Sequence, residues 1–363
     1  MMSRPTAMTI GVAGTEISEQ ERRLIEETQP FGLILFKRNC HRARQVRALI
    51  ADFKSLVSHD APVMIDQEGG RVNRLAAPPW PPFPAPRAMT LLEEAEIGSY
   101  DDAIYWHSRL TGEVLRNLDV TVNCSPMLDI PVDGSDPIVL GDRTYGDDAD
   151  TVESAGLHAI RGLREAGVIP VIKHLPGHGR ATVDSHHALP VIDCDIDTLA
   201  ETDFRPFAAA SLLYGDRVMG MTGHLLLPQI DEQPVTLSET IIQQVIRDKI
   251  GFSGHLMADD IQMGALSQGG NENLAARAEA AIKAGCDSVL YCAPDCSLWS
   301  EIAESVGEIG DHGWESWQAA SNARSTPATP MDHETFLSHH RRWLTPAMIG
   351  LSNSRTKVDP TAG

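Results

Sequence analysis

The sequence predicts an α/β protein built as a single (β/α)8 TIM-type barrel. Short apolar runs alternate with amphipathic helical segments, polar residues follow the ends of these runs, and no glycine-rich phosphate fingerprint follows the first run. The eight runs that we interpret as strands cover residues 9–13, 32–36, 62–65, 120–123, 168–172, 217–221, 255–258 and 288–292. The missing fingerprint disfavours the runner-up, a doubly wound open sheet.

Helical segments are predicted between most of these strands. Residues 18–29, after the first strand, begin with a capping box formed by Ser18 and Glu21. Residues 237–250, between the sixth and seventh strands, have Ser238 as a plausible N-cap. A further helical piece is expected at 332–344. We therefore expect one catalytic domain over residues 1–345, with residues 346–363 forming a disordered C-terminal tail.

Polar side chains lie at the carboxyl ends of five predicted strands. They are Asp66 and Glu68 after the third strand, Asp129 after the fourth, Lys173 and His174 after the fifth, His224 after the sixth, and Asp259 and Asp260 after the seventh. Barrel enzymes place their active sites at this end of the strands. The proline-dense loop 76–86 is expected to run extended nearby, and its Trp80 either stacks on a sugar or covers the barrel.

Composition narrows the range of partners. The 363 residues carry a formal net charge of −20, which disfavours nucleic acid and anionic membrane surfaces because both require clustered Lys and Arg. A small-molecule or neutral polymer substrate fits better. The first 14 residues lack the apolar stretch of a signal peptide, and no run of about 18 apolar residues occurs, so a cytoplasmic location is expected. The six cysteines show no disulfide framework and no CxxC pair.

Residues 173–190, KHLPGHGRATVDSHHALP, form the segment richest in reactive groups. Asp184 and His186 are two residues apart, close enough for the carboxylate to hold the imidazole as a general acid/base. Asp259, at another strand end, could serve as a nucleophile, and the structural alternative, which the spacing favours less, is a helix N-cap or a loop salt bridge. The histidines lack the spacing of a zinc site because Pro176 separates His174 from His178. No metal or other cofactor is implied.

Three long motifs in the sequence resemble those of a known enzyme family. MIDQEGGRVNRL (64–75), KHLPGHG with DSHHALP (173–190) and GFSGHLMADDIQMGAL (251–266) resemble bacterial β-N-acetylhexosaminidases of glycoside hydrolase family 3, of the NagZ type. LILFKRN (33–39), NCSPMLDIP (123–131) and DRTYG (142–146) agree in the same order. The resemblance covers roughly residues 8–300 and implies a single (β/α)8 domain in short members, in agreement with the strand pattern.

The resemblance also implies roles for individual residues. It makes Asp259 the nucleophile of a retaining mechanism and His186 the acid/base, with Asp184 as its dyad partner. The residues implied to bind the sugar are Asp66, Arg74, Arg143, Lys173 and His174. The implied substrate is a terminal β-linked N-acetylglucosamine, and in cytoplasmic Gram-negative members it comes from a peptidoglycan turnover fragment, N-acetylglucosamine linked to 1,6-anhydro-N-acetylmuramic acid with or without a peptide.

Alternatives stay open at this point. Phosphate could replace water in the second step, which would make the enzyme a phosphorylase. The alternative that is not an enzyme is a catalytically silent sugar-binding barrel. Asp259 and Asp260 side by side also superficially fit substrate-assisted hydrolysis. Four positions depart from the resembled pattern: Ala258, Gly223, Arg180 and Ala181. The last two lie in the DSH loop and affect the expectation for that loop more than that for catalysis.

Overall fold

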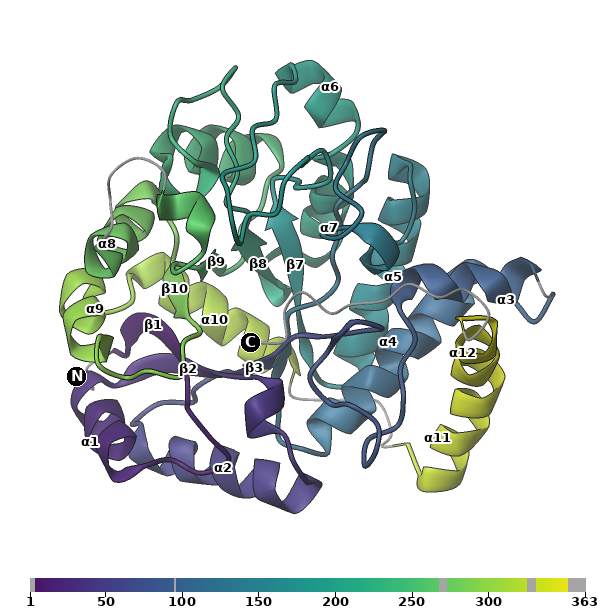
Figure 1. Ribbon diagram of the computed structural model, residues 1–363, viewed down its shortest axis with the longest axis horizontal. Helices are drawn as coiled ribbons and strands as arrows, with labels where there is room; N and C mark the ends of the chain where they lie inside the picture. The colour runs from purple at the N-terminus through teal and green to yellow at the C-terminus, as the bar shows by residue number, and fades with distance from the viewer. Residues whose placement is uncertain (1–3, 95, 268–272, 325–330, 352–363) are drawn as a thin grey trace.

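The computed structural model describes residues 4–94, 96–267, 273–324 and 331–351. Its centre is a closed barrel of eight parallel strands in the order β1-β10-β9-β8-β7-β6-β3-β2 (Figure 1). The strands are β1 (Thr6–Gly11), β2 (Pro30–Leu35), β3 (Val63–Ile65), β6 (Val122–Asn123), β7 (Ile169–Leu175), β8 (Met219–Thr222), β9 (Leu256–Asp260) and β10 (Ser288–Tyr291). Pairing of β1 with β10, from Met8 opposite Val289 to Ile10 opposite Tyr291, closes the ring. The predicted (β/α)8 barrel is confirmed.

Each of the eight predicted runs overlaps one barrel strand, because buried β-branched and aliphatic runs are typical of parallel strands covered on both faces. The structure adds a small antiparallel hairpin, β4 (Gln67–Gly69) and β5 (Val72–Asn73). The sequence did not predict this hairpin because its strands are two and three residues long and mostly polar. It follows β3 directly, and Glu68 on it is buried.

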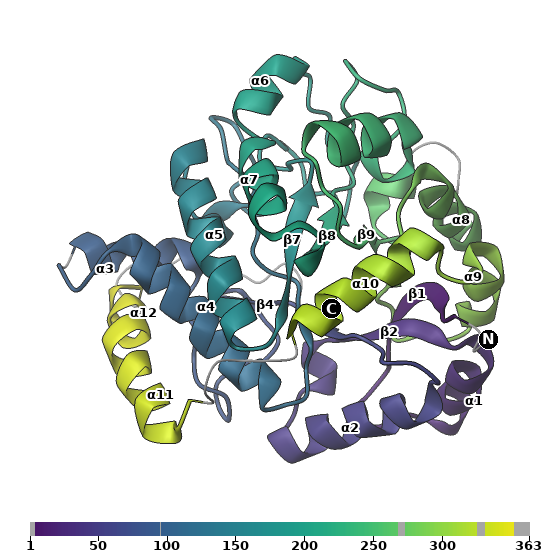
Figure 2. The ribbon, with the colours of Figure 1, turned by 180° about the vertical axis from the view of Figure 1, so that it is seen from behind.

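Helices surround the barrel in both views (Figures 1 and 2). The α-helices are α1 (Glu19–Thr28), α2 (Ala43–Leu56), α3 (Thr90–Glu94), α4 (Tyr100–Arg116), α5 (Ala149–Glu165), α6 (Ile196–Glu201), α7 (Arg205–Tyr214), α8 (Leu274–Ala284), α9 (Trp299–Val306), α10 (Asp311–Arg324), α11 (His333–His339) and α12 (Thr345–Leu351). Shorter or irregular turns are η1 (Lys37–Asn39), η2 (Pro86–Met89), η3 (Gly141–Arg143), η4 (Gly215–Arg217), η5 (Val235–Leu237), η6 (Ile241–Lys249), η7 (Gly264–Ser267) and η8 (His340–Leu344).

Both predicted helix starts are confirmed. Ser18 and Glu21 form the capping box of α1, with the Ser18 amide donating to Glu21 over 2.7 Å. The Ser238 hydroxyl accepts the amide of Ile241 at 3.0 Å and so caps the segment that contains η6. That segment is wound as a π-helix, which the apolar spacing did not indicate.

The end of the barrel opposite the polar residues is closed by α10 (Figure 2). Trp317 packs edge-on against Phe31 at the start of β2 and donates its indole N–H to the carbonyl of Asp60 at 3.1 Å. His255, just before β9, is stacked on Phe31 and bonded to the carbonyl of Gly313 at 3.0 Å. Helix α10 thus covers this end of the barrel, and the polar residues predicted from the sequence lie at the other end of the strands.

The predicted helix at 332–344 is confirmed as α11 and η8, with Asp332 capping α11. Residues 345–351 continue as α12, so the prediction of a disordered tail is wrong for residues 346–351. Residues 352–363 lie outside the described residues. Trp80 is buried in the hydrophobic core and is 8% exposed. This burial favours the expectation that Trp80 covers the barrel and disfavours stacking on a sugar. Among the described residues, no helix is both long and apolar enough to cross a membrane.

Candidate active site

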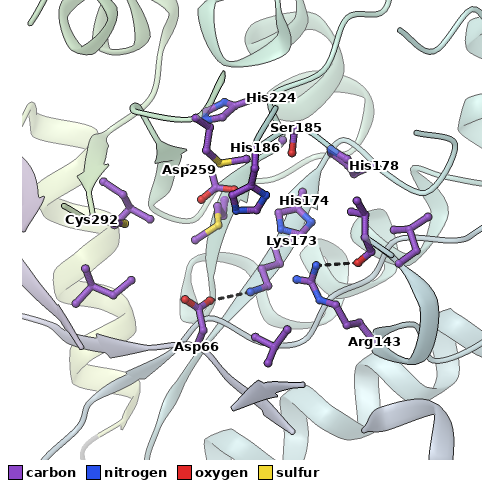
Figure 3. Close-up of a pocket in the computed structure, with 18 of the residues that line it drawn as sticks. Asp66, Arg143, Lys173, His174, His178, Ser185, His186, His224, Asp259 and Cys292 are labelled. Atoms are coloured by element: carbon purple, nitrogen blue, oxygen red, sulfur yellow. Dashed lines mark hydrogen bonds and ion pairs between the residues drawn. The ribbon is translucent and has the colours of Figure 1, made fainter. Parts of the chain in front are cut away.

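A cavity that is partly open to solvent lies at the carboxyl ends of the barrel strands (Figure 3). Charged and polar groups from five different strand ends line it together with aliphatic side chains. The lining includes Asp66, Arg74, Arg143, Lys173, His174, His178, Ser185, His186, His224, Asp259, Met263 and Cys292. Seven of the eight predicted site residues are among them. Asp184 reaches the cavity only through His186.

Four charged groups form one side of the cavity, which we call the charged wall: the buried Glu68 and Lys173 and the partly buried Asp66 and Arg143. Lys173, at the end of β7, lies 2.9 Å from an oxygen of Asp66 and 2.7 Å from one of Glu68. Arg143, in η3, binds both oxygens of Glu68 at 2.9 and 2.8 Å, the bidentate geometry that fixes both partners. Arg74, after β5, lies 3.3 Å from Asp66.

Mutual pairing keeps these groups ionised in spite of their burial. Burial acts to raise the pKa of Glu68, but the charges of Arg143 and Lys173 outweigh it and hold that pKa well below its usual range. Burial likewise opposes ionisation of Asp66, and Lys173 and Arg74 lower its pKa. Burial acts to lower the pKa of Lys173, but Asp66 and Glu68 raise it. The wall is therefore a fixed array of donors and acceptors suited to sugar hydroxyls.

A second buried carboxylate orients the histidine that follows Lys173. Asp129, after β6, accepts from Nδ1 of His174 at 2.7 Å and from the backbone amide of His178 at 2.6 Å. Burial opposes its ionisation, but His174 lowers the pKa of Asp129. Because Nδ1 of His174 is held in this way, its Nε2 is left to face the cavity.

The predicted dyad is formed within one turn. Oδ1 of Asp184 lies 2.7 Å from Nδ1 of His186 and also accepts the backbone amide of His186 at 2.9 Å. Burial opposes the ionisation of Asp184, but these two hydrogen bonds lower its pKa. The His186 side chain is 49% exposed and lines the same cavity as Asp259, as Figure 3 shows. An ionised partner on Nδ1 leaves Nε2 as the atom that exchanges protons.

Asp259 and Asp260, which spacing could not separate, have different surroundings at the end of β9. Asp259 lines the cavity, and its carboxylate accepts the amide of Asp260 at 2.8 Å. Burial opposes its ionisation, but His224 and His174 lower the pKa of Asp259. The carboxyl of Asp260 instead accepts the backbone amide of Gln262 at 3.2 Å, and burial together with Asp259 raises its pKa to about 6. Asp259 is thus an anion that faces the cavity.

The first half of the loop after β7 is tightly packed. Arg180 donates to Asp203 at 2.8 Å and to Thr202 at 3.1 Å, Ala181 is fully buried, and a Cβ on Gly179 would lie 1.9 Å from the carbonyl oxygen of Ile130. The two departures from the resembled pattern therefore anchor the loop to the barrel.

The sequence places Glu68, Asp129 and His224 at strand ends but does not indicate a role for them. Glu68 neutralises two cations of the wall, and His224 bridges the carbonyl of Asp260 and the hydroxyl of Thr236 at 3.0 and 2.8 Å. Their position at strand ends was the available signal. Among the described residues no cluster of His, Cys, Asp and Glu is arranged to hold a metal ion.

Comparison with known proteins places this site in a family. A model described as the glycosyl hydrolase family 3 N terminal domain matches residues 6–316. Proteins named Beta-hexosaminidase from Xanthomonas oryzae pv. oryzae and Methylobacillus flagellatus are 34% and 32% identical to this chain. These matches cover 79% and 78% of this chain and 84% and 81% of theirs.

Two solved structures share the fold over nearly the whole chain. NagZ from Neisseria gonorrhoeae in complex with N-trifluoroacetyl-D-glucosamine has a TM-score of 0.79 and 25% identity, covering 96% of this chain and 97% of that one. A glycoside hydrolase family 3 β-N-acetylglucosaminidase from Paenibacillus sp. str. FPU-7 has a TM-score of 0.80 and 28% identity, covering 93% of this chain and 66% of that one. The chain belongs to glycosyl hydrolase family 3 and groups with its β-hexosaminidases.

Proposed function

We propose that the protein is a retaining exo-β-N-acetylglucosaminidase that acts through a covalent glycosyl-enzyme on Asp259. The observation that carries the proposal is that an ionised Asp259 and a histidine held by Asp184 face one cavity beside the charged wall. Names of relatives and structural neighbours, which include β-hexosaminidases and β-N-acetylglucosaminidases, support this substrate class.

In the first step Asp259 attacks the anomeric carbon while Nε2 of His186 donates its proton to the departing oxygen. In the second step the neutral imidazole takes a proton from water, which attacks the glycosyl-enzyme and releases Asp259. Retaining enzymes usually use a second carboxyl as the acid/base, about 5 to 5.5 Å from the nucleophile. An imidazole in its place is uncharged after proton donation, so it does not repel an anion.

The environment of Asp260 favours this covalent route over substrate assistance. Substrate-assisted hydrolysis needs a carboxylate that orients the acetamido group of the bound sugar. The Asp260 carboxyl is occupied with backbone amides at the ends of β9 and β10, whereas Asp259 faces the cavity. The acetamido group is then bound, and we assign that task together with recognition of the hydroxyls to the wall, Arg74 and His174.

We further propose that the natural substrate is a peptidoglycan turnover fragment, N-acetylglucosamine linked to 1,6-anhydro-N-acetylmuramic acid, with or without a peptide, hydrolysed in the cytoplasm. This source is what the motif resemblance to NagZ-type enzymes implies.

Release of nitrophenol from 4-nitrophenyl N-acetyl-β-glucosaminide, beside the corresponding glucoside, tests the proposal. Wild type should act on the N-acetyl substrate, and Asp259→Ala should abolish turnover because no nucleophile remains. Activity in Asp259→Ala close to that of wild type would overturn the assignment. A sugar 1-phosphate formed only in phosphate buffer would identify a phosphorylase, and sugar binding without any release would identify a silent barrel. The anhydromuramyl disaccharide, assayed in parallel, tests the substrate source.

A further inference from the structure

We infer that Gly264, in the turn after β9, is a positioning residue that docks the acid/base loop (residues 182–188) against the turn that follows the nucleophile. This inference rests on the proposed function, because it assigns Gly264 to the geometry of the proposed proton transfer. The acid/base loop and η7 are about 80 residues apart in the sequence, yet their backbones meet directly.

Two backbone hydrogen bonds form the dock. The amide of Gly264 donates to the carbonyl of His186 at 3.1 Å, and the amide of Ala265 donates to the carbonyl of Ser185 at 3.0 Å. These carbonyls belong to the acid/base and to the residue before it. The position of His186 is thus set by contact with the chain segment that begins at Asp259.

The dock requires a glycine. A Cβ built on Gly264 would lie 2.7 Å from the carbonyl oxygen of His186 and 3.0 Å from that of His187. Both atoms belong to the backbone, so no side-chain rotation relieves the contact. Since an ordinary van der Waals contact begins near 3.4 Å, one of the two segments must move by several tenths of an ångström.

The acid/base loop is the segment that would move. Arg277, buried in α8, fixes the turn by donating to the carbonyl of Ile261 at 3.1 Å and to the hydroxyl of Ser267 at 3.0 Å. Ala265 and Leu266 of the turn are buried, whereas Val183, His186 and His187 of the loop are exposed. A methyl group at position 264 would therefore shift His186 and leave Asp259 in place.

The consequence is specific to proton transfer. A misplacement of the order of 1 Å can reduce a rate by about a hundredfold. Gly264→Ala should lower kcat/KM by about that factor on substrates with poor leaving groups, such as phenyl N-acetyl-β-glucosaminide. On the 2,4-dinitrophenyl glycoside, whose leaving group needs no proton, glycosylation of Asp259 should stay within about threefold of wild type.

Gly14→Ala is the matched control. Gly14 also lies in a loop at the catalytic end, and a Cβ built on it meets nothing within 4 Å. The control should match wild type on both substrates. Azide adds a second readout: in Gly264→Ala it should speed release of the enzyme-bound sugar as glycosyl azide, because azide attacks without a general base. Equal losses on both leaving groups, or no loss on either, would overturn the inference.

Hydrogen exchange of the wild-type protein keeps the inference testable even where Gly264→Ala does not fold. The amides of Gly264 and Ala265 should exchange more slowly than the amide of Val183, an exposed residue of the acid/base loop. Exchange of both at the rate of an open turn would contradict the dock. Failure of the proposed function is separate from these outcomes, because it shows as retained activity in Asp259→Ala.

Discussion

The charged wall and the acid/base loop serve the same cavity but are built in opposite ways. In the wall, Glu68 and Lys173 have side chains 1% and 3% exposed, and each charge has at least one buried partner of opposite sign. In the loop, the dyad depends on a single turn, and the His186 side chain is 49% exposed. The comparison teaches that binding groups can be fixed by the core, whereas a group that exchanges protons must stay accessible. It also predicts that substitutions in the two regions have different consequences.

The largest effect is expected from Glu68→Gln. This substitution leaves Arg143 and Lys173 buried with one carboxylate fewer, and breaking a buried ion pair costs about 3 to 5 kcal/mol. The free energy of unfolding measured in urea should fall by that amount, and substrate binding should weaken with it. Glu165→Gln, which alters the exposed pair with Arg161, is the control and should cost about 1 kcal/mol or less. Equal effects of the two variants would break the comparison.

Asp184→Ala should show the reverse pattern. Loss of the carboxylate frees the His186 ring, so kcat/KM on poor leaving groups should fall by about 10²-fold or more, within the range attributed to general acid/base catalysis. Unfolding free energy should change by about 1 kcal/mol or less, because the turn lies at the surface. Asp133→Ala, in a neighbouring exposed loop, serves as the control. A stability loss as large as that of Glu68→Gln would show that the loop belongs to the core.

Lowering the pH should reduce the difference in unfolding free energy between wild type and Glu68→Gln. The folded-state pKa of Glu68 lies below its unfolded value of about 4.3, because Arg143 and Lys173 outweigh burial. Its contribution to stability is therefore present above that unfolded value and is lost as pH falls through the folded pKa. Urea unfolding at pH 7, 5 and 3.5 should give a gap between wild type and Glu68→Gln that is constant at the first two values and begins to shrink at the last. A gap that widens in acid would contradict the pairing.

The smallest effect is expected far from the site, at His312. Its hydrogen bond to Asp287, at 3.0 Å, raises the pKa of the imidazole. The pair stabilises the protein below the unfolded pKa of about 6.5 and loses this contribution as pH rises through the folded value. Because His312 is half exposed, His312→Asn should cost about 0.5 kcal/mol at pH 5.5 and nothing at pH 8.5. A cost that persists at pH 8.5 would point to packing instead of charge.

Features that depend on neighbouring residues could be predicted from the sequence. Short apolar runs located all eight barrel strands, the spacing of Ser18 and Glu21 located the start of α1, and the two-residue spacing of Asp184 and His186 predicted their hydrogen bond. Each of these is written in a few consecutive residues, because strand burial, capping and short turns are local.

Which distant groups meet could not be predicted from local sequence patterns. Asp66 and Lys173 are 107 positions apart, and Glu68 and Arg143 are 75 apart. Barrel closure brings them together, and burial then makes their pairing strong. The different surroundings of Asp259 and Asp260 and the dock at Gly264 arise in the same way. The physical reason is that local patterns fix backbone conformation, whereas the protonation state of a carboxyl and the position of a loop depend on what the folded chain places beside them.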